Sequence, residues 1–303
     1  MPAQPEAFFL PAQPPESGQR FCIYYPSTPG GTPKGLVLYI HPFAEEMNKS
    51  RRMAALQARA LAQAGFAVLQ IDLLGCGDSS GDFGDATWAA WVNDVVQGCQ
   101  WLRARSPSNH DGMAPTPLWL WGLRAGCLVV VEAASRLSEP CNFLFWQPPA
   151  AGKSLLQQFL RLKVAGDMLG GQAKGAMEAM RNQLAQGDSV EIAGYRLSPG
   201  LASGLEQAVL TPPPGTTREQ RLAWIELSTR QDAALSPISA KLVSEWRESG
   251  MDCQSHIVQG PAFWQTLEIE DAPALIDATI SALLAPGSTP LPSTAAVADT
   301  VIA

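Results

Sequence analysis

A run of small residues surrounds one arginine near the middle of the chain, at Gly122-Leu123-Arg124-Ala125-Gly126. A sharp turn from a strand into a helix needs small neighbours on either side, and it raises one side chain above the sheet. A nucleophile for acyl transfer could occupy that raised position. Arginine is cationic at any physiological pH and cannot act as a nucleophile. This turn therefore presents a fixed positive charge at Arg124.

Three carboxylates are candidate partners for this cation. A positive charge at a helix N-terminus costs about 0.3–1 kcal/mol, which a nearby anion would offset. Asp232 follows a predicted strand downstream of the turn, where a triad acid is expected, and we expect it within salt-bridge distance of Arg124. Glu45 and Glu46 are the second candidates, because the loop after His41 should border the same cavity. These two acids are also typical of a solvated loop or of the first turn of a helix.

Two interpretations of Arg124 remain open at this point. It could pair with a protein carboxylate, or it could stay partly free and bind a carboxylate or phosphate group of a ligand. Instead of pairing with Arg124, Glu45 or Glu46 could act as a general base on water alongside His41.

The histidine expected of a catalytic base is missing from the loop after the last predicted strand. Phe263 and Trp264 stand near that position and could form the wall of an apolar pocket. His256 falls within the predicted strand and is typical of a hydrogen-bonded structural residue, while His110 is typical of a surface loop. His41 is the best-placed histidine, either as a base or as a brace for the loop after its strand.

The loop that would stabilise an oxyanion is also altered. Pro42 removes one backbone N–H, which leaves Ala125 and Phe43 as candidate donors.

Two functions therefore stay in competition. In the first, an enzyme acts on an ester-, thioester- or glycolipid-type substrate, with Arg124 as an electrophilic clamp and His41 or a glutamate as base. In the second, a catalytically silent protein binds an anionic, acyl or sugar ligand, or a partner protein, in the same cavity.

The composition argues against several other classes of protein. A net charge of −7 with no cluster of basic residues disfavours a nucleic-acid surface. No apolar run approaches the roughly 18–20 residues of a membrane span, and residues 1–17 lack the pattern of a secretory signal. The six cysteines form no C-x-x-C pair and have no regular spacing. We expect a cytoplasmic protein with reduced thiols, no metal site and no cofactor, and the sequence leaves the oligomeric state open.

The elements that must position these residues alternate along the chain. Short apolar runs predict buried strands at 36–40, 66–71, 118–121, 143–146, 222–227 and 256–258. Helical patterns lie at 53–64, 87–103, 125–137, 239–248 and 272–284. This alternation predicts an α/β fold with a mostly parallel central sheet and helices on both faces.

The alternation breaks once, over residues 149–220. Helical patterns at 155–162 and 172–184 predict a helical insertion, which we place as a lid over the strand ends. The core should then comprise residues 20–148 and 221–285. We expect a flexible N-terminal segment over residues 1–19 and a disordered tail over residues 286–303, which lacks periodicity.

Two loops near the turn resemble those of the α/β-hydrolases. The run from Asp72 to Ser79 has the pattern D-x-x-G-x-G-x-S at the end of a buried strand, which is common in that superfamily. His41-Pro42 stands where the superfamily's oxyanion loop begins, often with His-Gly. Together with the turn at Arg124 and the downstream acid Asp232, these motifs predict the α/β-hydrolase fold over residues 20–285.

Four longer runs carry a closer resemblance. They are His41–Arg52, Gly122–Gly126, Phe145–Pro148 and Gly260–Thr266. In these runs the chain resembles the second of two α/β-hydrolase families found with the exosortase A export system. The resemblance implies a bacterial cytoplasmic protein linked to exopolysaccharide and sorted-protein export, in a family named as hydrolases without an established substrate.

Overall fold

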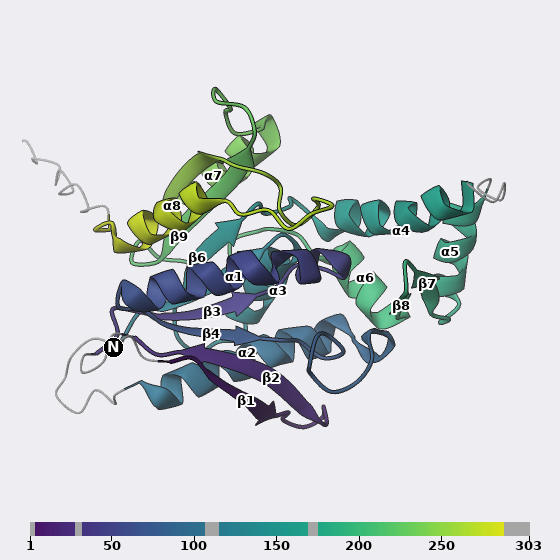
Figure 1. Ribbon diagram of the computed structural model, residues 1–303, viewed down its shortest axis with the longest axis horizontal. Helices are drawn as coiled ribbons and strands as arrows, with labels where there is room; N and C mark the ends of the chain where they lie inside the picture. Colours follow the sequence, from purple (N-terminus) through teal and green to yellow (C-terminus); the bar gives the residue numbers. More distant parts are fainter. Residues whose placement is uncertain (1–3, 28–31, 107–114, 169–174, 288–303) are drawn as a thin grey trace, which may run out of the picture.

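One large sheet organises the molecule. The computed structural model describes residues 4–27, 32–106, 115–168 and 175–287. Within them, eight strands form a sheet in the order β1-β2-β4-β3-β5-β6-β9-β10 (Figure 1). Their bounds are Glu6–Pro11, Gln19–Tyr25, Ala67–Ile71, Leu36–Ile40, Leu118–Leu123, Asn142–Trp146, Arg221–Ser228 and Asp252–Gln259, in that order. Neighbouring strands from β4 to β10 run parallel, so the predicted mostly parallel sheet is confirmed.

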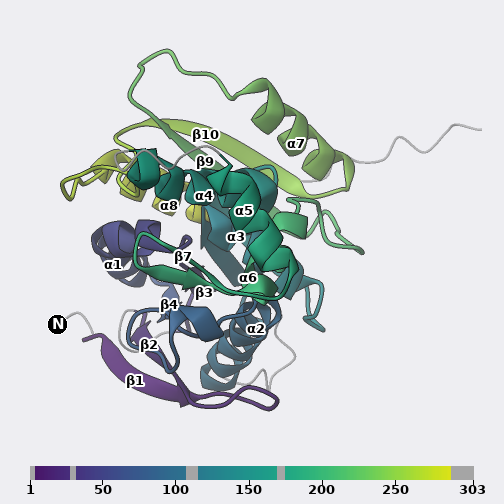
Figure 2. The same ribbon diagram turned by 90° about the vertical axis from the view of Figure 1, so that its right-hand side faces the viewer.

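Helices cover both faces of this sheet. For that reason every residue of β3, β5 and β6 is buried, and these strands are apolar except for Asn142 at the start of β6. One face packs against α1 (Glu45–Gln63) and α8 (Pro273–Leu284). The other packs against α2 (Trp88–Arg105), α3 (Ala125–Ala134) and α7 (Pro237–Glu248) (Figure 2). Across the described part of the chain, no helix has both the length and the apolar character needed to cross a membrane.

Helix α1 starts earlier than its sequence pattern predicts. It begins at Glu45, whereas the apolar periodicity suggests a start at residue 53. The prediction was wrong because the residues between these points are mostly charged or polar, which hides the periodicity. Acids in the first turn, here Glu45 and Glu46, interact favourably with the helix dipole. The early start places a charged helical turn directly after the loop that follows β3.

The N-terminal segment forms an edge strand, and its prediction as a flexible segment was wrong for residues 6–11. Strand β1 pairs antiparallel with β2. Phe8 stacks on Trp101 of α2, with ring centroids 4.6 Å apart. Strand β1 thus contacts residues that are far away along the chain, and the local composition could not predict these contacts. An edge position also tolerates the proline at residue 11.

A buried ion pair joins the antiparallel edge of the sheet to α2. Arg20 Nε lies 2.7 Å from Asp94 Oδ1, and the two side chains are 0% and 2% exposed. The other carboxylate oxygen of Asp94 accepts a hydrogen bond from the Leu74 N–H at 2.8 Å. Burial raises the pKa of Asp94 to about 6, against the opposing influence of Arg20. These contacts tie together β2, α2 and the loop after β4.

The segment between β6 and β9 contains helices and a hairpin. Its elements are α4 (Gly152–Met168), α5 (Ala176–Ala185), β7 (Val190–Ile192), β8 (Tyr195–Leu197) and α6 (Pro199–Gln207). The expectation of a purely helical insertion missed the β7–β8 hairpin, whose turn is formed by Ala193 and Gly194 at positive φ. Helix α6 packs against α2 and α4. His110 and the predicted tail from residue 288 onward lie outside the described residues.

Candidate functional site

The turn at Arg124 has the sharp geometry that its small neighbours predict. Strand β5 ends at Leu123, α3 begins at Ala125, and Arg124 between them adopts φ 53° and ψ −119°. Its N–H donates to the Trp146 carbonyl, and its carbonyl accepts from the Cys127 N–H, both at 3.0 Å. Such a conformation costs a non-glycine residue about 1–3 kcal/mol and persists only where the surroundings impose it. The fold therefore holds this cation at the carboxyl end of β5.

The two glycines of the turn have no space for a side chain. A Cβ atom at Gly122 would lie 2.5 Å from the Cys127 nitrogen, and one at Gly126 would lie 2.3 Å from the Ile40 carbonyl oxygen. Gly126 therefore allows the start of α3 to pack directly on the end of β3. This close approach brings Arg124 next to the loop that leads into α1.

Substituting alanine at Gly126 is expected to destabilise the protein. The added methyl group must displace the backbone at Ile40, and overpacking of this kind lowers the free energy of unfolding by about 1–3 kcal/mol. Urea denaturation followed by circular dichroism measures the change. Gly287→Ala is the matched control, because a Cβ there meets its nearest atoms at 3.9 Å. Equal losses in the two variants would contradict the tight packing of the turn.

The guanidinium of Arg124 forms an ion pair with Glu46 in the first turn of α1. Arg124 Nη2 lies 3.2 Å from Glu46 Oε1, and Nε lies 3.3 and 3.4 Å from the two carboxylate oxygens. The side chains are only 13% and 10% exposed. Ala44, just before α1, adopts φ 49° and ψ −123°, nearly the backbone geometry of Arg124. The neighbouring strands β3 and β5 thus each lead through a strained turn into a helix, and the two helix starts meet at this pair.

Three further side chains surround the ion pair. Gln158 of α4 accepts a hydrogen bond from Arg124 Nη2 at 3.1 Å, and Gln265 donates to Glu46 Oε1 at 3.4 Å. The guanidinium carbon lies 5.8 Å from the centre of the Trp264 ring, within cation–π distance. We refer to these five residues as the Arg124 site. Gln158 and Gln265 carried no sequence signal of their own, because a lone glutamine in an insertion or loop matches no catalytic pattern.

Burial controls the protonation of both glutamates near Arg124. Desolvation raises the pKa of Glu46, although Arg124 and the hydrogen bond from Gln265 oppose this effect. Desolvation also raises the pKa of Glu45, whose Oε2 atom is buried with no hydrogen-bond partner among the described residues. Each carboxylate therefore takes up a proton at a higher pH than an ordinary glutamate does.

The space beside these groups is small in this structure. Its volume is about 20 Å³, which is room for roughly one water molecule. The residues that line it are Phe43, Glu45, Glu46, Leu155, Gln158 and Phe159. The last three belong to α4, so the first helix of the insertion forms one wall of this space.

Comparisons with known proteins agree with this architecture. A family model described as serine aminopeptidase, S33, matches residues 31–176. The human protein ABHD12B is 32% identical over 122 residues, which make up 40% of this chain and only 30% of that protein. Among solved structures, Est1E from Butyrivibrio proteoclasticus with bound ferulic acid superposes with a TM-score of 0.62 at 14% identity, covering 91% of this chain and 97% of Est1E.

A second solved structure shares the same fold. A soluble variant of monoglyceride lipase from Saccharomyces cerevisiae, in complex with a substrate analog, has a TM-score of 0.54 at 13% identity and covers 92% of this chain and 94% of the lipase. This chain has the α/β-hydrolase fold. The remaining site residues can therefore be compared with the positions that this superfamily uses for catalysis.

Asp232 does not pair with Arg124 in this structure, and the expectation that it would was wrong. Asp232 is exposed in the turn beyond β9, and within the described residues the ion pair of Arg124 is formed with Glu46. The physical reason is the early start of α1, which brings Glu46 to the guanidinium from the neighbouring strand. Of the three candidate acids, Glu46 is the partner in the structure.

His41 braces the loop after β3. Its Nδ1 atom lies 2.8 Å from the Pro42 carbonyl oxygen, and its Nε2 atom accepts a hydrogen bond from the Leu73 N–H at 3.3 Å. The ring is buried, and burial lowers the pKa of His41. The imidazole is thus neutral with its proton on Nδ1, and the lone pair of Nε2 is already engaged. This geometry favours the bracing interpretation over the base.

The two candidate oxyanion donors belong to adjacent segments of the α/β-hydrolase core. Ala125 is the buried first residue of α3, where N–H groups have no partner within the helix. Phe43 is buried in the loop after β3 and packs edge-on against Phe83 and Phe159, with centroids 5.5 and 5.1 Å away. The Phe159 ring of α4 therefore covers this side of the site.

Aromatic side chains pack together in the loop after β10. Phe263 and Trp264 are 1% and 4% exposed, and their rings meet edge-on at 5.1 Å. Phe263 also contacts Trp146 at 6.2 Å between ring centres. The two rings form a packed cluster, and the small space beside the Arg124 site is lined by other residues, so their role as the wall of a pocket stays a prediction.

Proposed function

We propose that this protein binds an anionic ligand through Arg124 and does not perform serine-type acyl transfer. The supporting observation is that the strained turn holds a guanidinium, 13% exposed, at the place of the superfamily's nucleophile. A guanidinium presents N–H donors in a planar fork that matches carboxylate and phosphate groups. Such a group on an acyl- or sugar-containing ligand would replace Glu46 as the partner of Arg124.

In this proposal the insertion acts as a lid. Gln158 bonds to Arg124, and Phe159 packs on Phe43, so α4 occupies the space that a ligand body would need. A ligand with an apolar chain would lie between α4 and the aromatic residues at Phe43 and Trp264.

Calorimetric titration with decanoate and decyl phosphate tests the proposal. We expect saturable binding of at least one of them, weakened about tenfold or more by Arg124→Ala, because hydrogen bonds to charged groups contribute about 1.5–3 kcal/mol. Arg181→Ala is the matched control, since Arg181 pairs with Glu206 within the insertion, away from the turn. Equal affinity in wild type and Arg124→Ala would overturn the proposal.

Glu45 supports a second candidate, hydrolysis of an ester- or thioester-type substrate at a non-standard site. Its buried, unpartnered Oε2 atom and raised pKa suit a general base or acid. In that case Glu45 would activate water while Arg124 stabilised the developing oxyanion. A panel of short esters and thioesters separates the candidates: turnover that is lost in both Glu45→Gln and Arg124→Ala favours the enzyme, whereas binding without turnover favours the ligand-binding protein.

We further propose a cytoplasmic role in exosortase A-linked exopolysaccharide export in a bacterium. This proposal rests on the motif resemblance. Four of the five residues of the Arg124 site lie in the sequence runs that carry this resemblance, namely Glu46, Arg124, Trp264 and Gln265. A glycolipid-linked intermediate would offer both the anionic group and the apolar body discussed above. Deleting the gene in its host should reduce exopolysaccharide export, and wild type but not Arg124→Ala should restore it.

A further inference from the structure

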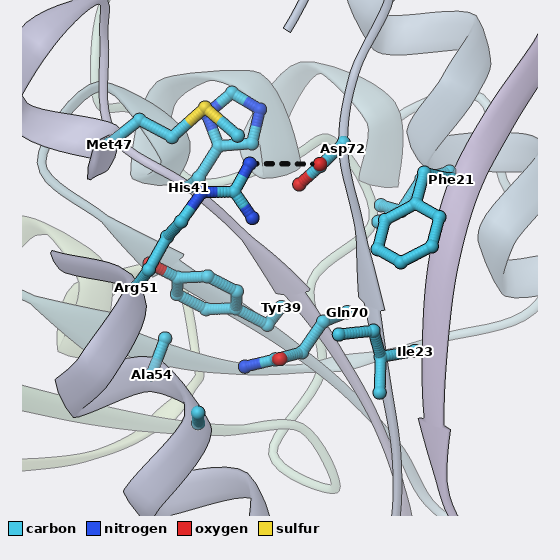
Figure 3. Close-up of a pocket in the computed structure, with 11 residues that line it drawn as sticks. Phe21, Ile23, Tyr39, His41, Met47, Arg51, Ala54, Gln70 and Asp72 are labelled. Atoms are coloured by element: carbon cyan, nitrogen blue, oxygen red, sulfur yellow. Dashed lines mark hydrogen bonds and ion pairs between the residues drawn. The ribbon is translucent and has the colours of Figure 1, made fainter. Parts of the chain in front are cut away.

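A second cavity lies between α1 and the strands β2, β3 and β4. Its volume is about 160 Å³, and its walls come from the sheet on one side and from α1 on the other (Figure 3). It shares no lining residue with the small space beside the Arg124 site. Phe21, Ile23 and Met47 supply apolar walls. A cavity of roughly 150 Å³ is large enough for a molecule the size of benzene.

Two hydrogen-bond donors at the sheet wall of this cavity have no partner. Tyr39 and Gln70 are register partners on β3 and β4, so their side chains lie side by side on the α1 face of the sheet. The Tyr39 hydroxyl and Gln70 Nε2 are both buried without a hydrogen-bond partner among the described residues. Tyr25 donates to Gln70 Oε1 at 3.3 Å, which leaves Nε2 as the free end of that amide. A hydroxyl and an amide nitrogen in this state both need an acceptor.

The charged groups at the cavity neutralise each other. Arg51 Nη2 lies 2.9 Å from Asp72 Oδ2, which also accepts from the Asp78 N–H at 3.1 Å. Gly77 packs against this pair, since a Cβ there would fall 2.0 Å from Asp72 Oδ2 and 2.2 Å from Arg51 Nη2. His41, which also lines the cavity, is neutral with both ring nitrogens engaged. An anion would be desolvated beside the Asp72 carboxylate, so the cavity favours an uncharged occupant.

We propose that this cavity is a binding site for a compact, uncharged molecule that carries a carbonyl oxygen. In this proposal the Tyr39 hydroxyl and the Gln70 amide nitrogen donate to that oxygen. The apolar body lies against Phe21, Ile23 and Met47, and Figure 3 shows these groups arranged around one space. The site is independent of the function proposed for Arg124.

NMR titration of the protein with benzamide tests this site. Benzamide combines a carbonyl oxygen with a body of suitable size, while benzoate has the same shape and a negative charge. We expect saturable benzamide binding, with shifts at residues around the cavity, and at least tenfold weaker binding of benzoate. Tyr39→Phe should weaken benzamide binding about tenfold, the effect of one lost hydrogen bond. Ala55→Leu, which adds bulk from α1, should abolish it.

The controls separate binding from folding. Tyr24→Phe removes the same atom on the opposite face of β2, where Tyr24 packs edge-on against Trp101, and it should leave benzamide binding unchanged. Thermal unfolding of each variant confirms that it is folded before it is titrated. The proposal is overturned if benzamide does not saturate, if Tyr39→Phe binds it as tightly as wild type, or if benzoate binds more tightly than benzamide.

Discussion

Asp94→Asn is expected to lower the free energy of unfolding by about 3–5 kcal/mol, because it leaves the buried Arg20 cation without its counter-charge. Asparagine matches the size of aspartate and can still accept the hydrogen bond from the Leu74 N–H. The loss would therefore report on the interaction with Arg20, both its charge and its hydrogen bond to Asp94. Urea denaturation at pH 7, followed by far-UV circular dichroism, measures it.

An exposed ion pair in the same region provides the control. Arg105 Nη2 lies 2.9 Å from Glu6 Oε2, but these side chains are 45% and 49% exposed. Water already solvates both charges, so Glu6→Gln should change the free energy of unfolding by less than about 1 kcal/mol. A loss for Asp94→Asn as small as that for Glu6→Gln would mean that Arg20 finds other compensation in the mutant.

Glu46→Gln is expected to strengthen the binding of an anion at Arg124 by about tenfold at pH 8, since it removes the carboxylate that competes with the ligand. The wild type should approach the same affinity as the pH falls. Burial raises the pKa of Glu46, so the native carboxyl becomes neutral at a higher pH than an ordinary glutamate and then releases the guanidinium. Affinity in wild type therefore rises from pH 8 toward pH 5, while Glu46→Gln shows little pH dependence.

Decanesulfonate is a suitable probe, because the sulfonate stays charged throughout this pH range. Isothermal titration of wild type and Glu46→Gln at several pH values gives both comparisons. Glu268→Gln removes the same charge from an exposed position in the loop after β10 and controls for net charge. An affinity that falls on acidification in wild type, or a Glu46→Gln variant that matches Glu268→Gln, would contradict the competition between Glu46 and the ligand.

Local pattern was sufficient to predict six of the eight strands in the described sheet, but not β1 or β2. Strands such as β3 and β5 are wholly buried, so their apolar runs are visible in the sequence. Other features depended on partners far along the chain. The charged first turn of α1 has no apolar periodicity, and β1 becomes a strand through pairing with β2 and packing on Trp101. The pairing of β1 with β2 and its packing on Trp101 produce no recognisable pattern in the sequence around β1.

The sequence by itself determined that a cation stands at the turn from strand to helix, because Gly122 and Gly126 specify the turn and position 124 is read directly. It also determined that the loop after β10 carries the aromatic residues Phe263 and Trp264. Only the tertiary structure decided that Arg124 pairs with Glu46 rather than Asp232. The strained turns at Ala44 and Arg124 follow adjacent strands and set the directions of α1 and α3. Those directions decide which acid reaches Arg124, and they depend on how the strands lie in the sheet rather than on their order along the chain.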